Sequence, residues 1–218
     1  MNQIDNGTIH YRDELVRKLI HLFSLSIPII YYFISRKEGI IILSVMTFIS
    51  LLAEALRYYA PSFNIFFTSA FGFLLRKHEV DSKKKNLTGA TYVFLSALLC
   101  IIIFPKLIFI TAFSILIISD IMAALIGRRY GKHKFLAKSL EGTLAFFVSA
   151  IIVVFLTPKF LGLPEEYAIA IFAAAVGAIA ENISFGFADD NLSVPLSVGL
   201  TMLGLYSLFL PQIKLFIF

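Results

Sequence analysis

The chain has 218 residues, of which 59% are apolar and 15% carry a charge, whereas charged residues make up about 25% of an ordinary soluble domain. A water-soluble fold of this size could not bury so much apolar side chain, so the composition predicts an all-α, polytopic transmembrane bundle that forms one domain over residues 1–218. The net charge is +5, but the basic residues cluster at the ends of apolar runs, where membrane topology explains them, and we expect no nucleic acid as a partner.

Seven apolar stretches approach the roughly 17–25 residues that a helix needs to cross the hydrocarbon core. They are Leu15–Ile34, Gly39–Leu56, Gly89–Phe104, Leu107–Ile126, Glu141–Leu156, Tyr167–Ile183 and Val194–Leu210. The segment from Ser62 to Leu75 is too short to cross and contains polar residues, so we expect it to lie in the membrane interface or against the bundle.

Most of the Lys and Arg residues fall in three segments, 12–18, 57–85 and 128–138, which share one side of the membrane if the seven spans alternate. Cytoplasmic segments carry an excess of Lys and Arg. The pattern therefore predicts a multi-pass integral membrane protein with its N-terminus inside and its polar clusters at the cytoplasmic face.

The first polar cluster is a stripe of Glu14, Arg17, Lys18 and His21 at the entry to the first apolar stretch. Their spacing of i, i+3, i+4 and i+7 places them on one face of a helix. Arg and Lys at a helix end can simply extend to lipid headgroups. His21 lies one turn deeper, however, and polar groups inside a span usually face a protein interior or a wet cavity, so we interpret the stripe as functional.

The second cluster joins a carboxylate inside a span to a basic loop. Asp120 precedes Gly127 by seven residues, which places it about 10 Å below the inside end of its helix. The loop that follows carries Arg128, Arg129, Lys132 and Lys138, and a new helix opens at Ser139 with free N–H groups. Basic side chains beside a helix N-terminus are suited to phosphate.

A polyphosphate brings Mg²⁺, which takes oxygen ligands from one or two carboxylates. Asp120 and Glu141 flank the basic loop, so both are candidate metal ligands. A simpler interpretation makes Ser139 a helix cap and Glu141 a partner of the helix dipole. That interpretation leaves Asp120 unexplained.

The third cluster, Glu181 to Asn191, contains Asp189 and Asp190 but no Lys or Arg. An acidic inside loop opposes the topological trend and suggests that it complements a cation, either a metal or the basic loop, although a plain helix cap would also use these residue types. Two weaker candidates are the pair Glu54 and Arg57, and the hydroxyl-rich entry to the third span at Thr88 and Gly89.

These clusters, in this order, resemble the family of CTP-dependent lipid kinases that includes dolichol kinase, phytol kinase and CTP-dependent diacylglycerol kinase. The likeness to phosphatidate cytidylyltransferase is more distant. The matching segments are Glu14 to His21, Leu87 to Tyr92, Ser119 to Lys132, Lys138 to Thr143 and Asp190 to Pro195.

The resemblance implies transfer of the γ-phosphate of CTP to a membrane lipid alcohol with the help of Mg²⁺ or another divalent cation. The implied catalytic residues are Asp120, Asp190 and His21, and the implied metal ligands are Asp120, Glu141 and Asp190. The implied nucleotide-binding residues are Arg17, Lys18, Thr88, Gly89, Arg128, Arg129, Lys132, Lys138, Ser139 and Asn191. The general base stays open between Asp120, Asp189, Asp190 and His21.

Two other functions remain as alternatives. The cytidylyltransferase pattern has Ser-Pro and then Lys-Thr before its Glu-Gly, whereas this chain has Ala137-Lys138-Ser139-Leu140, which favours the kinases. A transporter would place its polar groups near the middle of the membrane, whereas these clusters lie toward one face. The identity of the lipid, the choice of CTP over ATP and the formation of a homo-oligomer are not determined by the residues.

Overall fold

The computed structural model describes residues 11–72, 75, 86–184 and 189–215. Within them the chain is almost entirely helical, which confirms the predicted helical class. The helices are α1 (Tyr11–Phe23), α2 (Ser26–Phe33), α3 (Arg36–Tyr59), α4 (Pro61–Phe71), α6 (Gly89–Ile103), α7 (Lys106–Tyr130), α8 (Leu140–Leu156), α9 (Pro164–Ile183) and α10 (Asp190–Phe209). Two short antiparallel strands, β1 (Lys134–Phe135) and β2 (Lys138–Ser139), form a hairpin between α7 and α8.

Five helical segments of the described chain are long and apolar enough to cross a membrane, which is consistent with an integral membrane protein. They are Arg12–Phe33, Arg36–Tyr59, Lys106–Tyr130, Pro164–Ile183 and Asp190–Phe209. The other two predicted spans are also apolar helices, but α6 has 15 residues and α8 has 17. The count of seven crossings and the inside N-terminus therefore stay predictions.

The first predicted span is two helices rather than one. Between α1 and α2, the backbone N–H groups of Ser24 and Leu25 donate to the carbonyls of His21 and Leu22, three residues earlier. Pro28 lies four residues after Ser24 and has no N–H to donate to the carbonyl there, and its ring crowds that carbonyl. A proline at this place explains why the helix breaks and starts again.

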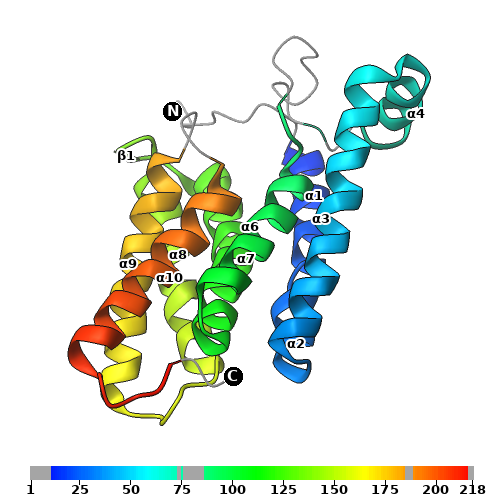
Figure 1. Ribbon diagram of the computed structural model, residues 1–218. Helices are drawn as coiled ribbons and strands as arrows, with labels where there is room; N and C mark the ends of the chain where they lie inside the picture. Colours follow the sequence, from blue (N-terminus) through cyan, green and yellow to red (C-terminus); the bar gives the residue numbers. More distant parts are fainter. Residues whose placement is uncertain (1–10, 73–74, 76–85, 185–188, 216–218) are drawn as a thin grey trace.

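The segment expected in the interface is helical as α4, which turns away from the end of α3 (Figure 1). Its described residues include no buried side chain, and three of its phenylalanine rings contact one another in sequence. Residues 73 and 74 of that predicted segment, and part of the second basic segment, lie outside the described residues.

Helix α7 forms the centre of the bundle. In its most apolar window 72% of the residues are buried, against 17% to 50% in the other four long segments.

Small residues let neighbouring helices approach closely. A Cβ atom on Gly199 of α10 would lie 2.4 Å from the ring of Phe104, and one on Gly177 of α9 would lie 2.5 Å from Val198.

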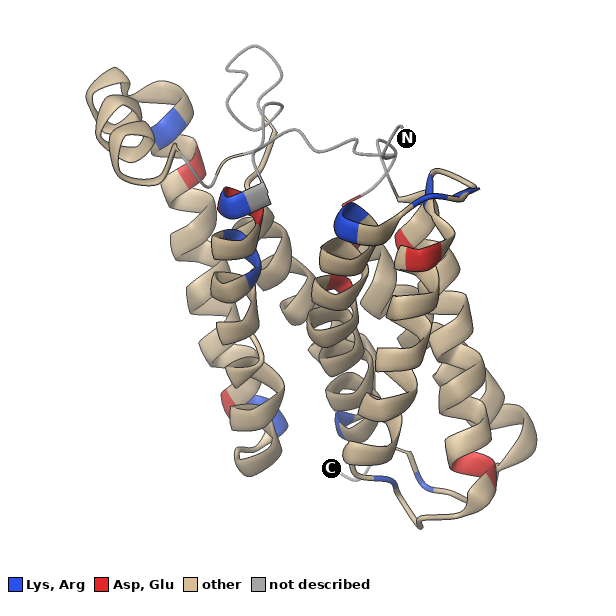
Figure 2. Cartoon of the chain, turned by 180° about the vertical axis from the view of Figure 1, so that it is seen from behind, with Lys and Arg blue, Asp and Glu red and all other residues tan. Residues whose placement is uncertain are grey.

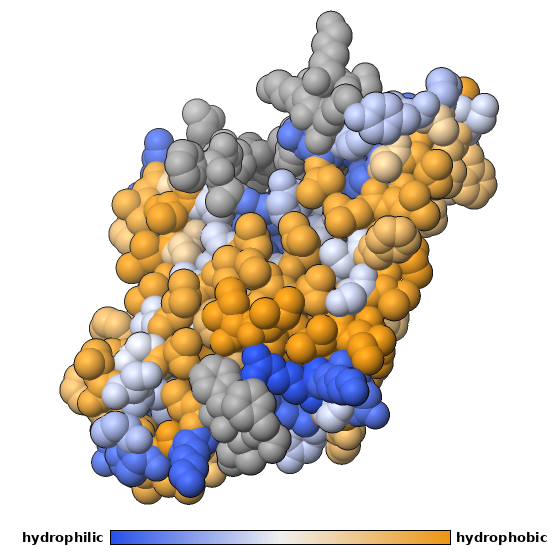
Figure 3. Space-filling view, viewed as in Figure 1, coloured by the Kyte–Doolittle hydropathy of each residue, from blue (hydrophilic) through white to orange (hydrophobic). Residues whose placement is uncertain are grey.

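Charged residues gather toward the ends of the helices, with most of them at the end that carries the β1–β2 hairpin (Figure 2). Hydrophobic side chains cover most of the middle of the face shown in Figure 3. This distribution is the one expected of a helical bundle in a lipid bilayer.

The opposite end of the bundle is held by Glu166, which is fully buried in the first turn of α9. Its carboxylate accepts hydrogen bonds from the backbone N–H groups of Phe160 (2.8 Å), Leu161 (2.9 Å) and Leu163 (3.0 Å). The hydroxyl of Tyr206 in α10 donates a fourth bond at 3.1 Å. One side chain thus ties the α8–α9 loop to both α9 and α10.

We expect Glu166→Ala to lower the free energy of unfolding by about 3 kcal/mol, because buried N–H groups would lose a charged acceptor. Thermal unfolding of the detergent-purified protein measures the change. Glu165→Ala is the control, since that side chain is exposed. Equal stability of the two variants would contradict the assigned role of Glu166.

Candidate functional site

Three carboxylates converge at the hairpin end of the bundle. Asp120 of α7, Glu181 of α9 and Asp190 of α10 each place an oxygen within 4.8 Å of the others. Asp120 is 4% exposed and Glu181 3% exposed. We call these three residues the carboxylate cluster.

Two lysines neutralise part of this charge. Lys18 of α1 forms a buried ion pair and hydrogen bond with Asp120. Lys138 of β2 lies 2.5 Å from Glu181 and 3.8 Å from Asp190. Burial lowers the pKa of Lys138, but the charges of Glu181 and Asp190 outweigh that effect and raise it above the ordinary lysine value, so this lysine stays protonated at neutral pH.

His21 also faces the carboxylate cluster. Its Nε2 lies 3.6 Å from Asp120 Oδ2, and this buried nitrogen has no hydrogen-bond partner among the described residues. Five elements, α1, α7, α9, α10 and β2, therefore supply the charged or titratable groups at this position. The structure brings together the predicted catalytic residues Asp120, Asp190 and His21.

The rest of the α1 stripe also faces the protein. Glu14 pairs with Arg17 one turn later, and Arg128 Nη1 at the end of α7 lies 3.6 Å from Glu14 Oε2. Lys18 is buried and does not extend to the surface. The stripe therefore connects α1 to the C-terminal half of α7.

The basic loop is shaped by close backbone contacts. A Cβ on Gly142 would lie 3.2 Å from the Cα of Gly127, and a Cβ on Gly131 would lie 2.2 Å from the Gly127 carbonyl. Ser139 caps α8, with Oγ accepting from the N–H of Gly142 at 3.2 Å. Arg129 and Lys132 are exposed beside this turn.

Asn182 fixes the hairpin to α9. Its Oδ1 accepts from the N–H groups of Ala137 (2.9 Å) and Lys138 (3.1 Å), and its Nδ2 donates to Thr143 Oγ1 at 2.6 Å. The next residue back, Glu181, carries the third carboxylate of the cluster. The carboxylate cluster and the basic loop are thus positioned by consecutive residues of one helix.

Glu141, a predicted metal ligand, is not in the carboxylate cluster. Its carboxylate accepts from the backbone N–H of His133 at 3.2 Å and lies 2.7 Å from His133 Nδ1. The third carboxylate is instead Glu181, which the sequence places in the acidic segment but does not single out. The available signal was a glutamate in the last turn of an alanine-rich helix with no basic residue nearby in sequence.

The predicted nucleotide-binding residues near the third span contact a different group. The N–H of Thr88 donates to Glu54 Oε1 at 2.7 Å, as does Thr91 Oγ1 at 3.0 Å. Arg57 pairs with the same carboxylate at 2.8 Å. Thr88 and the start of α6 at Gly89 are therefore tied to α3.

Asn191 belongs to the start of α10. Its N–H and its Nδ2 both donate to Asp189 Oδ1, at 3.0 Å and 2.7 Å. Asp189 therefore acts as the helix cap that the residue types also predicted. Residues 185–188 of the acidic segment lie outside the described residues.

The comparisons with known proteins find two relatives of similar length. The chain is 33% identical over 186 residues to uncharacterized protein RP860 of Rickettsia prowazekii, a match covering 84% of the chain and 90% of that protein. It is 31% identical over 193 residues to uncharacterized protein MJ1137 of Methanocaldococcus jannaschii, covering 85% and 90%. The chain belongs to the family of these two proteins.

A shorter match reaches a protein of named activity. The chain is 38% identical over 80 residues to dolichol kinase sec59 of Schizosaccharomyces pombe, which covers 35% of the chain and 16% of that kinase. No protein-family model matches the chain, and no solved structure does. The partial match gives weak support to a likeness to dolichol kinase.

The carboxylate cluster is suited to bind a cation, and the basic residues beside it are suited to bind an anion. Oxygen atoms of carboxylates are the ligands that hard divalent cations prefer. Arg128, Arg129 and Lys132 lie at the adjoining ends of α7 and the hairpin, where they can neutralise phosphate charge.

We expect Asn182→Leu to loosen the hairpin, because three hydrogen bonds are lost while the side-chain size is nearly kept. Losing bonds of about 1 kcal/mol each should raise the rate of tryptic cleavage at Lys132 and Lys134 by about tenfold or more. Ile183→Ala, at an exposed position of the same helix, is the control. An unchanged rate in the Asn182 variant would show that the asparagine does not hold the hairpin.

Proposed function

We propose that this protein is a CTP-dependent kinase that transfers the terminal phosphate of CTP to the hydroxyl of a membrane lipid alcohol. The observation that carries the proposal is Asp120, a buried carboxylate that faces Lys18 and His21 and belongs to a cluster beside a basic loop. The partial identity to a dolichol kinase supports the same reaction class.

In this reaction the lipid hydroxyl oxygen forms a bond to the terminal phosphorus of CTP. The bond between that phosphorus and the oxygen bridging to CDP breaks, and CDP leaves with the electron pair. The hydroxyl proton passes to a base, for which Asp120, Asp190 and His21 are candidates because all three lie at the cluster. Phosphoryl transfer otherwise depends mainly on positioning and charge neutralisation.

The residues fit a bound Mg²⁺. Asp120, Glu181 and Asp190 supply carboxylate oxygens within 4.8 Å of one another, a donor set suited to a hard divalent cation, which would neutralise phosphate charge. Lys138 and the arginine pair Arg128 and Arg129 would hold phosphate oxygens. The proposed active site would face the cytoplasm, in line with the charge bias of the sequence.

The first test uses purified protein with Mg²⁺, γ-labelled CTP or ATP, and a panel of polyprenol, phytol and diacylglycerol. Label from γ-labelled CTP in the organic phase on one lipid would support the kinase and identify its acceptor. A parallel reaction contains α-labelled CTP and phosphatidic acid. Label in its organic phase would instead favour a cytidylyltransferase. Absence of label in every combination would contradict both.

We expect Asp120→Asn to reduce lipid phosphorylation by roughly 100-fold or more, because the cluster loses a charged ligand and a candidate base. Glu165→Gln, an exposed carboxylate at the opposite end, is the matched control and should keep full activity. Both variants should elute as monodisperse protein. An active Asp120→Asn enzyme would refute the assignment.

A second pair of variants separates the observed third carboxylate from the predicted one. We expect Glu181→Gln to raise the half-saturating Mg²⁺ concentration roughly tenfold or more, as a lost metal ligand should. Glu141→Gln should change it little, because that carboxylate is hydrogen-bonded to His133. Titration of activity with Mg²⁺ measures both, and the reverse order would place the metal at Glu141.

A further inference from the structure

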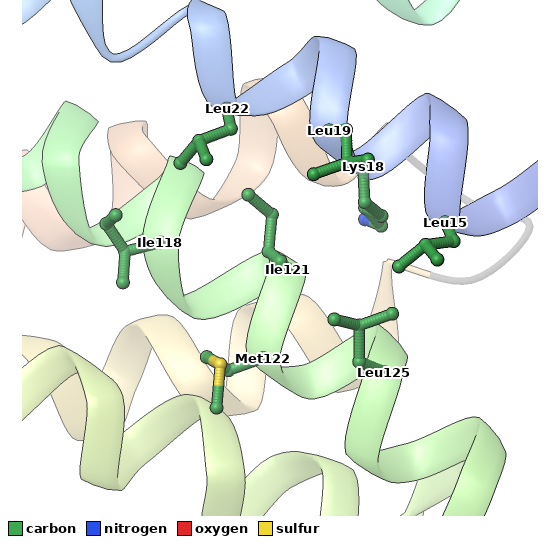
Figure 4. Close-up of a pocket in the computed structure, with 8 residues that line it drawn as sticks. All are labelled: Leu15, Lys18, Leu19, Leu22, Ile118, Ile121, Met122 and Leu125. Atoms are coloured by element: carbon green, nitrogen blue, oxygen red, sulfur yellow. The ribbon is translucent and has the colours of Figure 1, made fainter.

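A groove runs between α1 and α7 (Figure 4). Lys18, one of its lining residues, pairs with Asp120 of the carboxylate cluster. Its volume is about 180 Å³. Apart from Lys18, its lining is apolar: Leu15, Leu19 and Leu22 of α1, and side chains between residues 118 and 125 of α7. The three leucines have the spacing i, i+4, i+7, which forms one stripe of a helix.

The two helices run antiparallel along the two sides of the groove. Leu15 lies opposite Leu125 at one end, and Leu22 lies opposite Ile118 at the other (Figure 4). Seven residues of helix give the groove a length of about 10 Å. It is therefore a short groove that follows the two helices.

The surface of the groove is apolar along its whole length, but its two ends differ in what lies next to them. Glu14, Arg17 and Arg128 form their ion pairs next to the Leu15 end. Halfway along, Lys18 forms part of the wall and pairs with Asp120. Beyond that point the lining is apolar as far as Leu22 and Ile118.

The outer side of the groove opens to the surroundings of the bundle. Leu19 is 53% exposed and Leu22 is 41% exposed. In a bilayer these side chains would face hydrocarbon, so a lipid could enter from the side without crossing water.

We infer that the α1–α7 groove holds the hydrocarbon chain of the acceptor alcohol, with the hydroxyl beside Lys18 and Asp120 and the chain directed toward Leu22 and Ile118. The inference rests on the proposed function, because it identifies the hydroxyl as the acceptor. An apolar groove with one lysine in its wall, paired with the buried carboxylate of Asp120, matches an amphiphile with a small polar head.

The size of the groove favours a lipid with a single chain. An apolar cavity of about 150 Å³ holds one benzene molecule. A groove of about 180 Å³ accommodates a segment of one hydrocarbon chain, so a second chain of the same lipid would have to lie outside it in the bilayer. An isoprenoid alcohol fits this description better than diacylglycerol.

The chain contains no tryptophan, so a single introduced tryptophan reports on one place. Leu22→Trp marks the apolar end of the groove, and Ile49→Trp marks an exposed position of α3 as the control. Each variant is placed in phospholipid vesicles and titrated with a phytol-type alcohol brominated on its chain, which quenches tryptophan on contact.

Quenching of Leu22→Trp should saturate with the alcohol and be reversed by unbrominated alcohol. Quenching of Ile49→Trp should rise in proportion to the brominated fraction, as random lipid contact does. Brominated diacylglycerol should need at least a tenfold higher fraction at Leu22→Trp. Linear quenching at both positions would overturn the inference. So would quenching of Leu22→Trp by brominated diacylglycerol at the same fraction as by the brominated alcohol.

A second measurement uses the unmodified chain and guards against a tryptophan that blocks the groove. A single-chain alcohol with a diazirine on its tail should label peptides containing residues 15–22 and 118–125, and excess alcohol should suppress that label. Label spread over α3 and α8 without suppression would contradict the groove.

These readouts do not depend on catalysis. Saturable quenching without phosphate transfer from CTP would support the groove as a lipid site and contradict the proposed kinase activity. Phosphate transfer from CTP together with linear quenching would support the proposed kinase activity and show that the acceptor lipid binds outside the groove.

Discussion

The carboxylate of Asp120 is buried in the most buried helix of the described bundle, and this charge constrains its surroundings. An isolated carboxylate in such a place costs several kcal/mol unless a cation and hydrogen bonds accompany it. Lys18 provides the cation from α1, which belongs to the segment Arg12–Phe33, where only 17% of the residues in the most apolar window are buried. The ion pair is thus a main contact that keeps α1 beside α7, and it does so without dense packing. The groove between the two helices follows from that loose packing.

The same requirement organises the other side of the carboxylate cluster. Glu181 is buried near Asp190, and Lys138 reaches both from the hairpin. The hairpin can approach because Gly127 and Gly142 let α7 and α8 come into close contact and because Asn182 holds the backbone at Lys138. Electrostatic pairing and close backbone packing therefore act together, and the basic loop is fixed over the carboxylates.

The sequence predicts the helices well because apolar runs and charged ends are local signals. It does not predict the break after α1, where the crowding caused by Pro28 overrides a continuous apolar run. Asp120 stands out because a charge inside an apolar run needs a partner, but its partner Lys18 is 102 residues away and only the fold identifies it. Local spacing cannot tell Glu141, which has the nearby partner His133, from Glu181, whose partner is 43 residues away. Thr88 likewise turns toward Glu54 of α3, a long-range contact that no local motif encodes.

Lys18 joins the two halves of the proposed reaction. In the structure three carboxylates face two ammonium groups, so the cluster has more acidic than basic groups. Under the proposed function, Asp120, Glu181 and Asp190 would hold a divalent cation, which would supply the positive charge that a polyphosphate needs, and Lys18 would interact with both Asp120 and phosphate. Lys18 also forms part of the groove wall, so this residue lies between the proposed metal site and the proposed lipid site. Under the proposed function, Lys18 therefore contributes both to the binding of the nucleotide and to the placement of the lipid hydroxyl.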